Sequence, residues 1–166
     1  MADLEAARRA IEEKLGQAGI AASESGGDLC IEAPAEAVSE VCTFLRDAPE
    51  LLCDYPADLC ARDDGEHILL WYRTYSTTHR LNVRLTVRLD RAAPEAPSVT
   101  GIWPGMNWHE RECFDLYGVR FVGHPDMDDP KRMRILLPED WEGHPFRKDY
   151  EPVFLGDPLH GPQPTN

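Results

Sequence analysis

The residue types that could carry chemistry are concentrated between Trp108 and Pro152, in the last third of a chain of 166 residues. Tryptophan, histidine, arginine, aspartate, glycine and proline are denser there than an ordinary hydrophobic core requires. The triplet Gly-His-Pro occurs twice, at residues 123–125 and 143–145. A segment this polar and this rich in proline is either an active site or a surface that docks on another protein.

Two carboxylates in this segment have the spacing of an acid–base pair. Glu112 and Asp115 are three residues apart and would share one face of a helix. In the structural alternative, Glu110 caps the start of the helix and Arg111 pairs with Asp115 four residues later. Because no nucleophile stands at a diagnostic spacing from these carboxylates, we favour the structural alternative.

Histidines and cysteines are the other candidates for chemistry. His109, His124 and Asp115 could hold a metal in a stand-alone metallohydrolase, but they lack the paired spacing that metal sites commonly use. Four of the five cysteines are enough in number for an iron–sulfur cluster, yet none forms a Cys-x-x-Cys pair. Since nucleotide-binding glycine motifs are also missing from the sequence, we expect no cofactor in this chain.

The charge of the chain restricts its partners. A formal net charge of −13 disfavours nucleic acid and direct adhesion to an anionic membrane. The chain opens with an acidic segment rather than a secretory signal, and its cysteine count is odd. We therefore expect free thiols in a reducing cytoplasm, no membrane span and proteins as partners.

Hydrophobic periodicity indicates which elements position the polar segment. Val38, Val41, Cys42 and Leu45 have helical spacing, and residues 81–89 alternate strictly between apolar and polar. Asn107 and Gly118 are placed to cap and end the helix that carries the carboxylates. We expect helices at 3–18, 34–48 and 108–117, and strands at 29–32, 59–62, 67–75, 80–89 and 99–103. Residues 90–98 are expected to form a loop.

These elements predict an α+β domain over residues 1–122, with a small antiparallel or mixed sheet and helices packed on one face. Beyond Phe121 no periodicity remains, so residues 123–166 are expected to form a long extended C-terminal arm. Six prolines between Pro125 and Pro158 favour an extended chain. Aromatic residues alternate with charges in it, namely Trp141, Phe146, Tyr150 and Phe154, and this composition is typical of protein interfaces.

The same segment resembles a known family. The run Glu110-Arg111-Glu112-x-Phe-Asp115-Leu-Tyr-Gly118-Val-x-Phe121-x-Gly123-His124-Pro125 is similar to the signature of the 30-kilodalton (C) subunit of proton-pumping NADH–quinone oxidoreductase, respiratory complex I. The short plastid and cyanobacterial form, the J subunit, is especially similar. The resemblance marks as interface or structural residues Glu110, Arg111, Glu112, Asp115, Gly123, His124, Pro125, Arg134, Gly143, Pro145, Arg147 and Asp149. We call these the signature residues.

The resemblance implies an accessory subunit of the peripheral arm of the complex, on the cytoplasmic side of the membrane and attached through partners. It implies no flavin or iron–sulfur cluster in this chain and no independent activity, with those cofactors in partner subunits. The implied partners are the large quinone-site subunit and the adjacent iron–sulfur subunit. We hypothesise that Arg111, Asp115, His124, Arg147 and Asp149 fix the arm against partner and core.

Two points remain open from the sequence. The family usually continues from Gly-His-Pro-Asp with leucine and a basic pair, whereas Asp126–Arg134 is longer and more acidic here. The alternatives are the equivalent subunit of an energy-conserving hydrogenase or of another quinone-reducing dehydrogenase, and the stand-alone metallohydrolase.

Overall fold

The computed structural model describes residues 4–151, apart from the side chain of Gln17. Its helices are α1 (Leu4–Leu15), α2 (Val38–Asp47), α3 (Met106–Tyr117) and α4 (Pro130–Met133), with short 3-10 helices η1 (Gly16–Ala18) and η2 (Ala35–Ala37). Its strands are β1 (Ala22–Ser25), β2 (Asp28–Ala33), β3 (Tyr55–Asp63), β4 (His67–Ser76), β5 (Leu81–Asp90), β6 (Glu95–Pro97) and β7 (Arg120–Val122). The predicted α+β class is confirmed.

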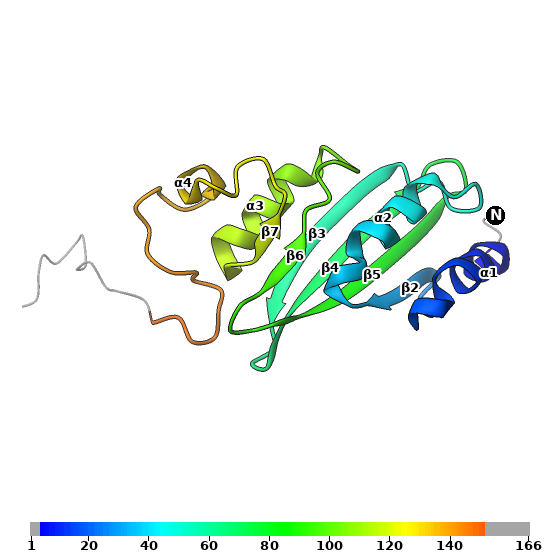
Figure 1. Cartoon of the computed structure of the whole chain (residues 1–166), viewed down its shortest axis with the longest axis horizontal. Coiled ribbons are helices and arrows are strands. Elements are labelled where there is room, and N and C mark those ends of the chain that lie inside the picture. Colours follow the sequence, from blue (N-terminus) through cyan, green and yellow to red (C-terminus); the bar gives the residue numbers. More distant parts are fainter. Residues whose placement is uncertain (1–3, 152–166) are drawn as a thin grey trace, which may run out of the picture.

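The main sheet has five strands in the order β1-β2-β5-β4-β3. β2 and β5 run parallel, and the other neighbours are antiparallel, so the sheet is mixed. One row of cross-strand neighbours consists of Ile31, Leu85, Tyr72 and Leu59, all buried. Because side chains alternate between the two faces of a sheet, this row marks the core face, which α1 and α2 cover (Figure 1).

Helix α2 forms as its spacing predicts. Val38, Val41, Cys42 and Leu45 are all buried against the sheet. Each fully buried aliphatic side chain stabilises the fold by roughly 1.5–3 kcal/mol. The helix ends at Asp47, before Pro49, and the backbone N–H of Ala48 still donates to the carbonyl of Phe44.

Several short segments differ from the sequence expectation. Strands β1, β6 and β7 were not expected, and β6, which lies within the predicted loop 90–98, pairs in parallel with β7 in a separate two-stranded sheet. The predicted strand at 99–103 is wrong, because that segment is a turn. The carbonyl of Val99 accepts hydrogen bonds from the backbone N–H groups of Ile102 and Trp103, each at 2.9 Å. These N–H groups therefore bond within the segment and are not paired with a neighbouring strand.

Helix α3 lies beside β3, the strand at one edge of the main sheet (Figure 1). The thiol of Cys113 faces the carbonyl of Leu59 at 3.8 Å. An uncovered edge strand invites pairing with other chains, so α3 also protects this edge.

The arm is irregular over residues 123–151, as expected, but it is not simply extended. It contains the four-residue helix α4, whose N-cap residue Asp129 accepts a hydrogen bond from the N–H of Lys131. The arm passes around α3 and then returns toward the sheet (Figure 1). The rest of the predicted arm, which includes Phe154, lies outside the described residues. None of the described helices is long and apolar enough to cross a membrane.

Candidate functional site

Helix α3 carries most of the candidate side chains, and its start differs from the prediction. The helix begins at Met106, and neither Asn107 nor Glu110 caps it. Glu110 is fully buried, and its Oε1 accepts a hydrogen bond from the N–H of Val99 at 2.7 Å. Burial raises the pKa of Glu110 to about 7, against the opposing effects of the Val99 N–H and the Ser98 hydroxyl. Glu110 therefore stabilises the turn at Val99, which precedes the helix, and does not cap the first turn of the helix.

Asp115 is the centre of the site, and its side chain is completely buried. Its Oδ1 accepts a hydrogen bond from Arg134 at 2.9 Å. Its Oδ2 accepts three successive backbone N–H groups, those of Ile135, Leu136 and Leu137, at 3.1, 2.8 and 2.9 Å. Burial alone would raise the pKa of Asp115, but these donors together hold it below its usual value.

The predicted pair of Arg111 with Asp115 is wrong. Arg111 instead donates to the backbone carbonyl of Arg134 at 2.7 Å. Arg134 takes the predicted place of Arg111 because it brings a guanidinium and the following N–H groups to the same carboxylate. We call Asp115, Arg134 and the N–H groups of residues 135–137 the arm anchor.

Arg134 also joins distant points of the arm. Its guanidinium donates to the carbonyls of Trp141 and Gly143, at 2.8 and 3.2 Å, and to the carbonyl of Asp115. It lies 5.8 Å from the centre of the Phe114 ring. A planar group with several fixed donors suits this role better than a lysine would.

The C-terminal end of α3 packs against His144, the histidine of the second Gly-His-Pro triplet. Gly118 ends the helix with a φ of 78°, as predicted. His144 Nδ1 donates to the carbonyl of Asp115 at 3.0 Å, and its ring packs edge-on against Phe114. A Cβ on Gly118 would stand 2.6 Å from the His144 ring. Burial lowers the pKa of His144, so the neutral ring is favoured there.

The end of the described arm is attached to β3 and to Arg91, the residue that follows β5. Asp63 accepts hydrogen bonds from Arg91 and from the backbone N–H of Lys148, which lies in the arm. The Arg91 guanidinium, with smaller help from the Lys148 N–H, holds the pKa of Asp63 well below its usual range. Arg147 donates to the carbonyl of Arg91 at 2.7 Å, and Asp149 pairs with Arg91 at 3.0 Å.

The first Gly-His-Pro triplet forms a tight turn. His124 is buried, and its Nδ1 accepts the N–H of Asp126 at 3.0 Å. The proton therefore lies on Nε2, which faces the carbonyl of Asn107 at 3.4 Å. Burial lowers the pKa of His124. Gly123, with a φ of 88°, permits the turn, and Pro125 is exposed.

Three signature residues make weaker contributions. Glu112 is exposed and forms no ion pair among residues 4–151. Gly143 has a φ of 80° and lies close under the ring of Tyr150, while Pro145 is partly buried. The structure thus gathers Arg111, Asp115, Arg134, Gly143 and Arg147 around the end of α3, and it leaves Glu112 outside this group.

Large apolar side chains point outward around the same elements. Trp108 on α3 is 65 % exposed, and Leu136 and Phe146 in the arm are 62 % and 58 % exposed. Val122 and Trp141 are also exposed. Sequence reasoning singled out Trp141 and Phe146 but missed Trp108. Helical spacing could have predicted the exposure of Trp108, because this residue lies on the side of the helix opposite to Met106, Glu110 and Cys113.

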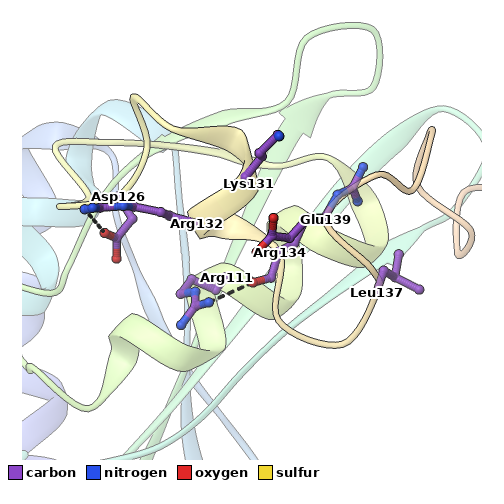
Figure 2. Close-up of a pocket in the computed structure, with 7 residues that line it drawn as sticks. All are labelled: Arg111, Asp126, Lys131, Arg132, Arg134, Leu137 and Glu139. Atoms are coloured by element: carbon purple, nitrogen blue, oxygen red, sulfur yellow. Dashed lines mark hydrogen bonds and ion pairs between the residues drawn. The ribbon is translucent and has the colours of Figure 1, made fainter.

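A hollow of about 360 Å³ opens on the outer side of the arm anchor (Figure 2). It is lined by Arg111, Asp126, Lys131, Arg132, Arg134, Leu137 and Glu139. We call it the basic hollow. The Asp126–Arg134 segment, which departs from the family pattern, forms one of its walls, and Arg132 lies 3.8 Å from Asp126 there.

The alternative metal site finds no support in the geometry. In the part of the chain that the structure describes, no three His, Cys, Asp or Glu side chains gather where a metal could bind. His109 faces Asp58 at 3.6 Å, whereas His124 and Asp115 have the separate partners described above.

A small α+β domain that holds its own arm by buried polar contacts, and that presents apolar side chains outside, has the character of a subunit of a larger assembly. The family model described as "Respiratory-chain NADH dehydrogenase, 30 Kd subunit" matches residues 31–153. The chain belongs to this family.

Two relatives are similar in sequence to this chain over most of its length. The C subunit of NADH-quinone oxidoreductase from Roseiflexus sp. (strain RS-1) is 43% identical over 133 residues, which cover 78% of this chain and 74% of the relative. The C 2 subunit of NADH-quinone oxidoreductase from Rhizobium etli (strain CIAT 652) is 40% identical over 140 residues, covering 80% and 72%.

Two solved structures share the fold. A trypsin-resistant fragment of Nqo5 superposes with a TM-score of 0.61 at 25% identity, covering 73% of this chain and 98% of the fragment. A chain of the membrane-bound sulfane sulfur reductase, an archaeal respiratory membrane complex, gives a TM-score of 0.72 at 21% identity, covering 89% and 85%. The second likeness shows the fold alone.

Proposed function

We propose that this chain is an accessory subunit of a membrane-bound, proton-translocating NADH–quinone oxidoreductase, and that it acts by docking and assembly rather than by chemistry. One observation carries the proposal: Asp115 and Arg134 turn inward and, with His144, hold the arm, while Trp108, Leu136 and Phe146 remain exposed. Exposed aromatic and aliphatic side chains on a rigid surface are typical of protein interfaces. Membership of the family supports the identity of the complex.

The carboxylates of the site support a role without catalysis. Asp115 already accepts four hydrogen bonds and has a lowered pKa, so it is a poor proton acceptor. Glu110 is buried behind the Val99 turn, away from the surface. Glu112 is exposed, and its side chain forms no hydrogen bond or ion pair within residues 4–151. No described pair of these groups has the geometry of a general acid and base.

The proposal places the redox cofactors outside this chain. Flavin and iron–sulfur clusters would reside in partner subunits, and the docking partners would be the large quinone-site subunit and the adjacent iron–sulfur subunit. The subunit would sit on the cytoplasmic side of the membrane and reach it through those partners. The relatives are named as C subunits of NADH-quinone oxidoreductase, which favours this complex.

The test is recovery of the complex with tagged variants of the full chain, expressed in place of the native subunit. Trp108→Glu and Leu136→Glu should each reduce the recovery of the other subunits by about tenfold, since a charge at an interface centre costs more than about 1 kcal/mol. Thr43→Glu is the control, because Thr43 is exposed but lies on α2, which carries none of the exposed apolar side chains. Recovery unchanged by both α3 and arm variants would contradict the proposal.

The partners recovered also decide between the main proposal and its nearest alternative. A flavin-containing NADH module would support the oxidoreductase, whereas a nickel centre would support an energy-conserving hydrogenase. The likeness to the sulfane sulfur reductase chain does not favour the alternative, because it concerns the fold alone.

A further inference from the structure

The basic hollow concentrates positive charge on an acidic protein. The chain has 17 lysines and arginines against 30 aspartates and glutamates, yet four cations line this one hollow. Arg111 comes from α3, Lys131 and Arg132 from α4, and Arg134 from the segment just beyond it (Figure 2). Elements from two parts of the chain therefore direct cations to one place.

Two of these cations are already neutralised. Arg134 pairs with Asp115 at 2.9 Å, and Arg132 lies 3.8 Å from Asp126 and 3.6 Å from Asp129. Within residues 4–151, neither Arg111 nor Lys131 has a carboxylate at ion-pair distance. Glu139 also lines the hollow without an ion pair among these residues. Arg111 and Lys131 are therefore the cations of the hollow whose charge is not balanced by a carboxylate of the described residues.

Arg111 is held in place while most of its donors stay unused. Its guanidinium makes one hydrogen bond, to the carbonyl of Arg134, and lies 5.6 Å from the centre of the Trp108 ring. Its buried Nε has no hydrogen-bond partner in the described part of the chain. A buried donor without a partner is costly and is rare in native proteins. A partner cannot reach the buried Nε, but Nη1 makes no hydrogen bond within residues 4–151 and is not buried, so this end of the fixed guanidinium can bind a carboxylate.

We propose that the basic hollow binds a carboxylate of a partner protein, an Asp or Glu side chain or a C-terminal carboxylate, through Arg111 and Lys131. The inference deepens the proposed function and rests on it. Leu137 lines the hollow and the exposed Trp108 lies beside Arg111, and such apolar side chains suit a protein segment better than a lipid phosphate. The net charge of −13 also opposes approach to an anionic membrane.

Carbodiimide cross-linking of the purified complex tests the inference directly, because this reagent joins an amine to a carboxylate without a spacer. We expect mass spectrometry to find Lys131 joined to an Asp, Glu or C-terminal carboxylate of another subunit. Lys131→Arg should remove this cross-link while assembly is retained, since arginine keeps the charge but not the reactive amine. A Lys131 that joins only carboxylates of its own chain, such as Glu139, would overturn the inference.

A charge reversal gives a second measurement. Lys131→Glu should lower the affinity for the partner subunits by about tenfold and weaken its salt dependence. Lys14→Glu is the matched control, because Lys14 is an exposed lysine on α1. If the complex assembles normally with Lys131→Glu, the hollow inference fails while the proposed function stands. If the wild-type chain recovers no oxidoreductase subunits, both fail.

The competing source of an anionic group is tested with vesicles. Vesicles that contain anionic phospholipid should not bind the full chain above the level of neutral vesicles. Binding that requires Lys131 and anionic lipid would overturn the inference in favour of a phosphate ligand.

Discussion

Leu85 in the sheet and Arg134 in the arm both pack closely, but against different neighbours. Leu85 lies among apolar side chains of adjacent strands. Arg134 lies against one carboxylate and the backbone carbonyls of Asp115, Trp141 and Gly143. The domain is thus stabilised mainly by apolar burial, which is insensitive to direction, and the arm by directional polar contacts. The two regions should respond differently to substitution and to pH.

The largest expected effect is on the arm anchor. Asp115→Ala leaves Arg134 and three backbone N–H groups without their acceptor, and removing one member of a buried charge pair costs about 3–5 kcal/mol. We expect the N–H groups of residues 135–137 to lose their protection from hydrogen exchange, while β4 and β5 keep theirs. Equal loss in both regions would contradict the separation of arm and domain.

A substitution in the sheet should give the opposite pattern. Leu85→Ala removes a buried side chain from a central strand and should lower the free energy of unfolding by about 2–5 kcal/mol. Denaturant unfolding measures this loss. Because the arm depends on a folded α3, its protection should fall together with that of the sheet. An arm that stays protected while the sheet unfolds would refute this dependence.

The pH response should also differ between the regions. Glu110 has a pKa of about 7 in the fold, raised mainly by burial, so its protonation stabilises the fold fully below its unfolded pKa near 4.5. This contribution is lost as the pH rises through 7. Glu110→Gln replaces the carboxyl by a group that stays neutral. At pH 9 its free energy of unfolding should therefore exceed that of the wild type by on the order of 2 kcal/mol.

The control for this pH prediction is the arm. Asp115 and Asp63 have lowered pKa values, so their contribution is present above their unfolded pKa and is lost only as the pH falls through the folded value. Thermal unfolding of the wild type and Glu110→Gln at pH 5 and pH 9 compares the two trends. A constant difference between them across this range would count against the buried ionisation of Glu110.

The smallest expected effect is at the junction of the two regions. Gly118→Ala places a side chain at a φ of 78° and against His144, which should cost about 1–2 kcal/mol. The cost of Gly118→Ala, measured once in the wild type and once in the His144→Ala background, separates the causes, because that background removes the collision but keeps the backbone strain. If the cost is the same in both backgrounds, contact with His144 is not part of it.

The same contrast explains what could be predicted from the sequence. The spacing of α2 and the alternation of β5 reflect burial against neighbouring elements, so they are visible in a short window. β6 has only three residues, and its partner β7 follows it in the sequence only after α3. So short a strand with so distant a partner shows no alternation that a local window could detect. For Asp115, the local rule of four-residue spacing favoured Arg111, but the true partner, Arg134, is 19 residues away. Tertiary contacts therefore decided the polar site.

The arm anchor has a consequence for the order of events during biogenesis. Asp115 lies on α3, which packs on the domain through Cys113, and from there it holds residues 134–137. Those residues also leave the ribosome after the domain does. A partner that requires α3 and the anchored arm together would thus meet its complete binding face only on a finished chain. In this way the anchor would work as a maturation checkpoint, which withholds incomplete chains from assembly.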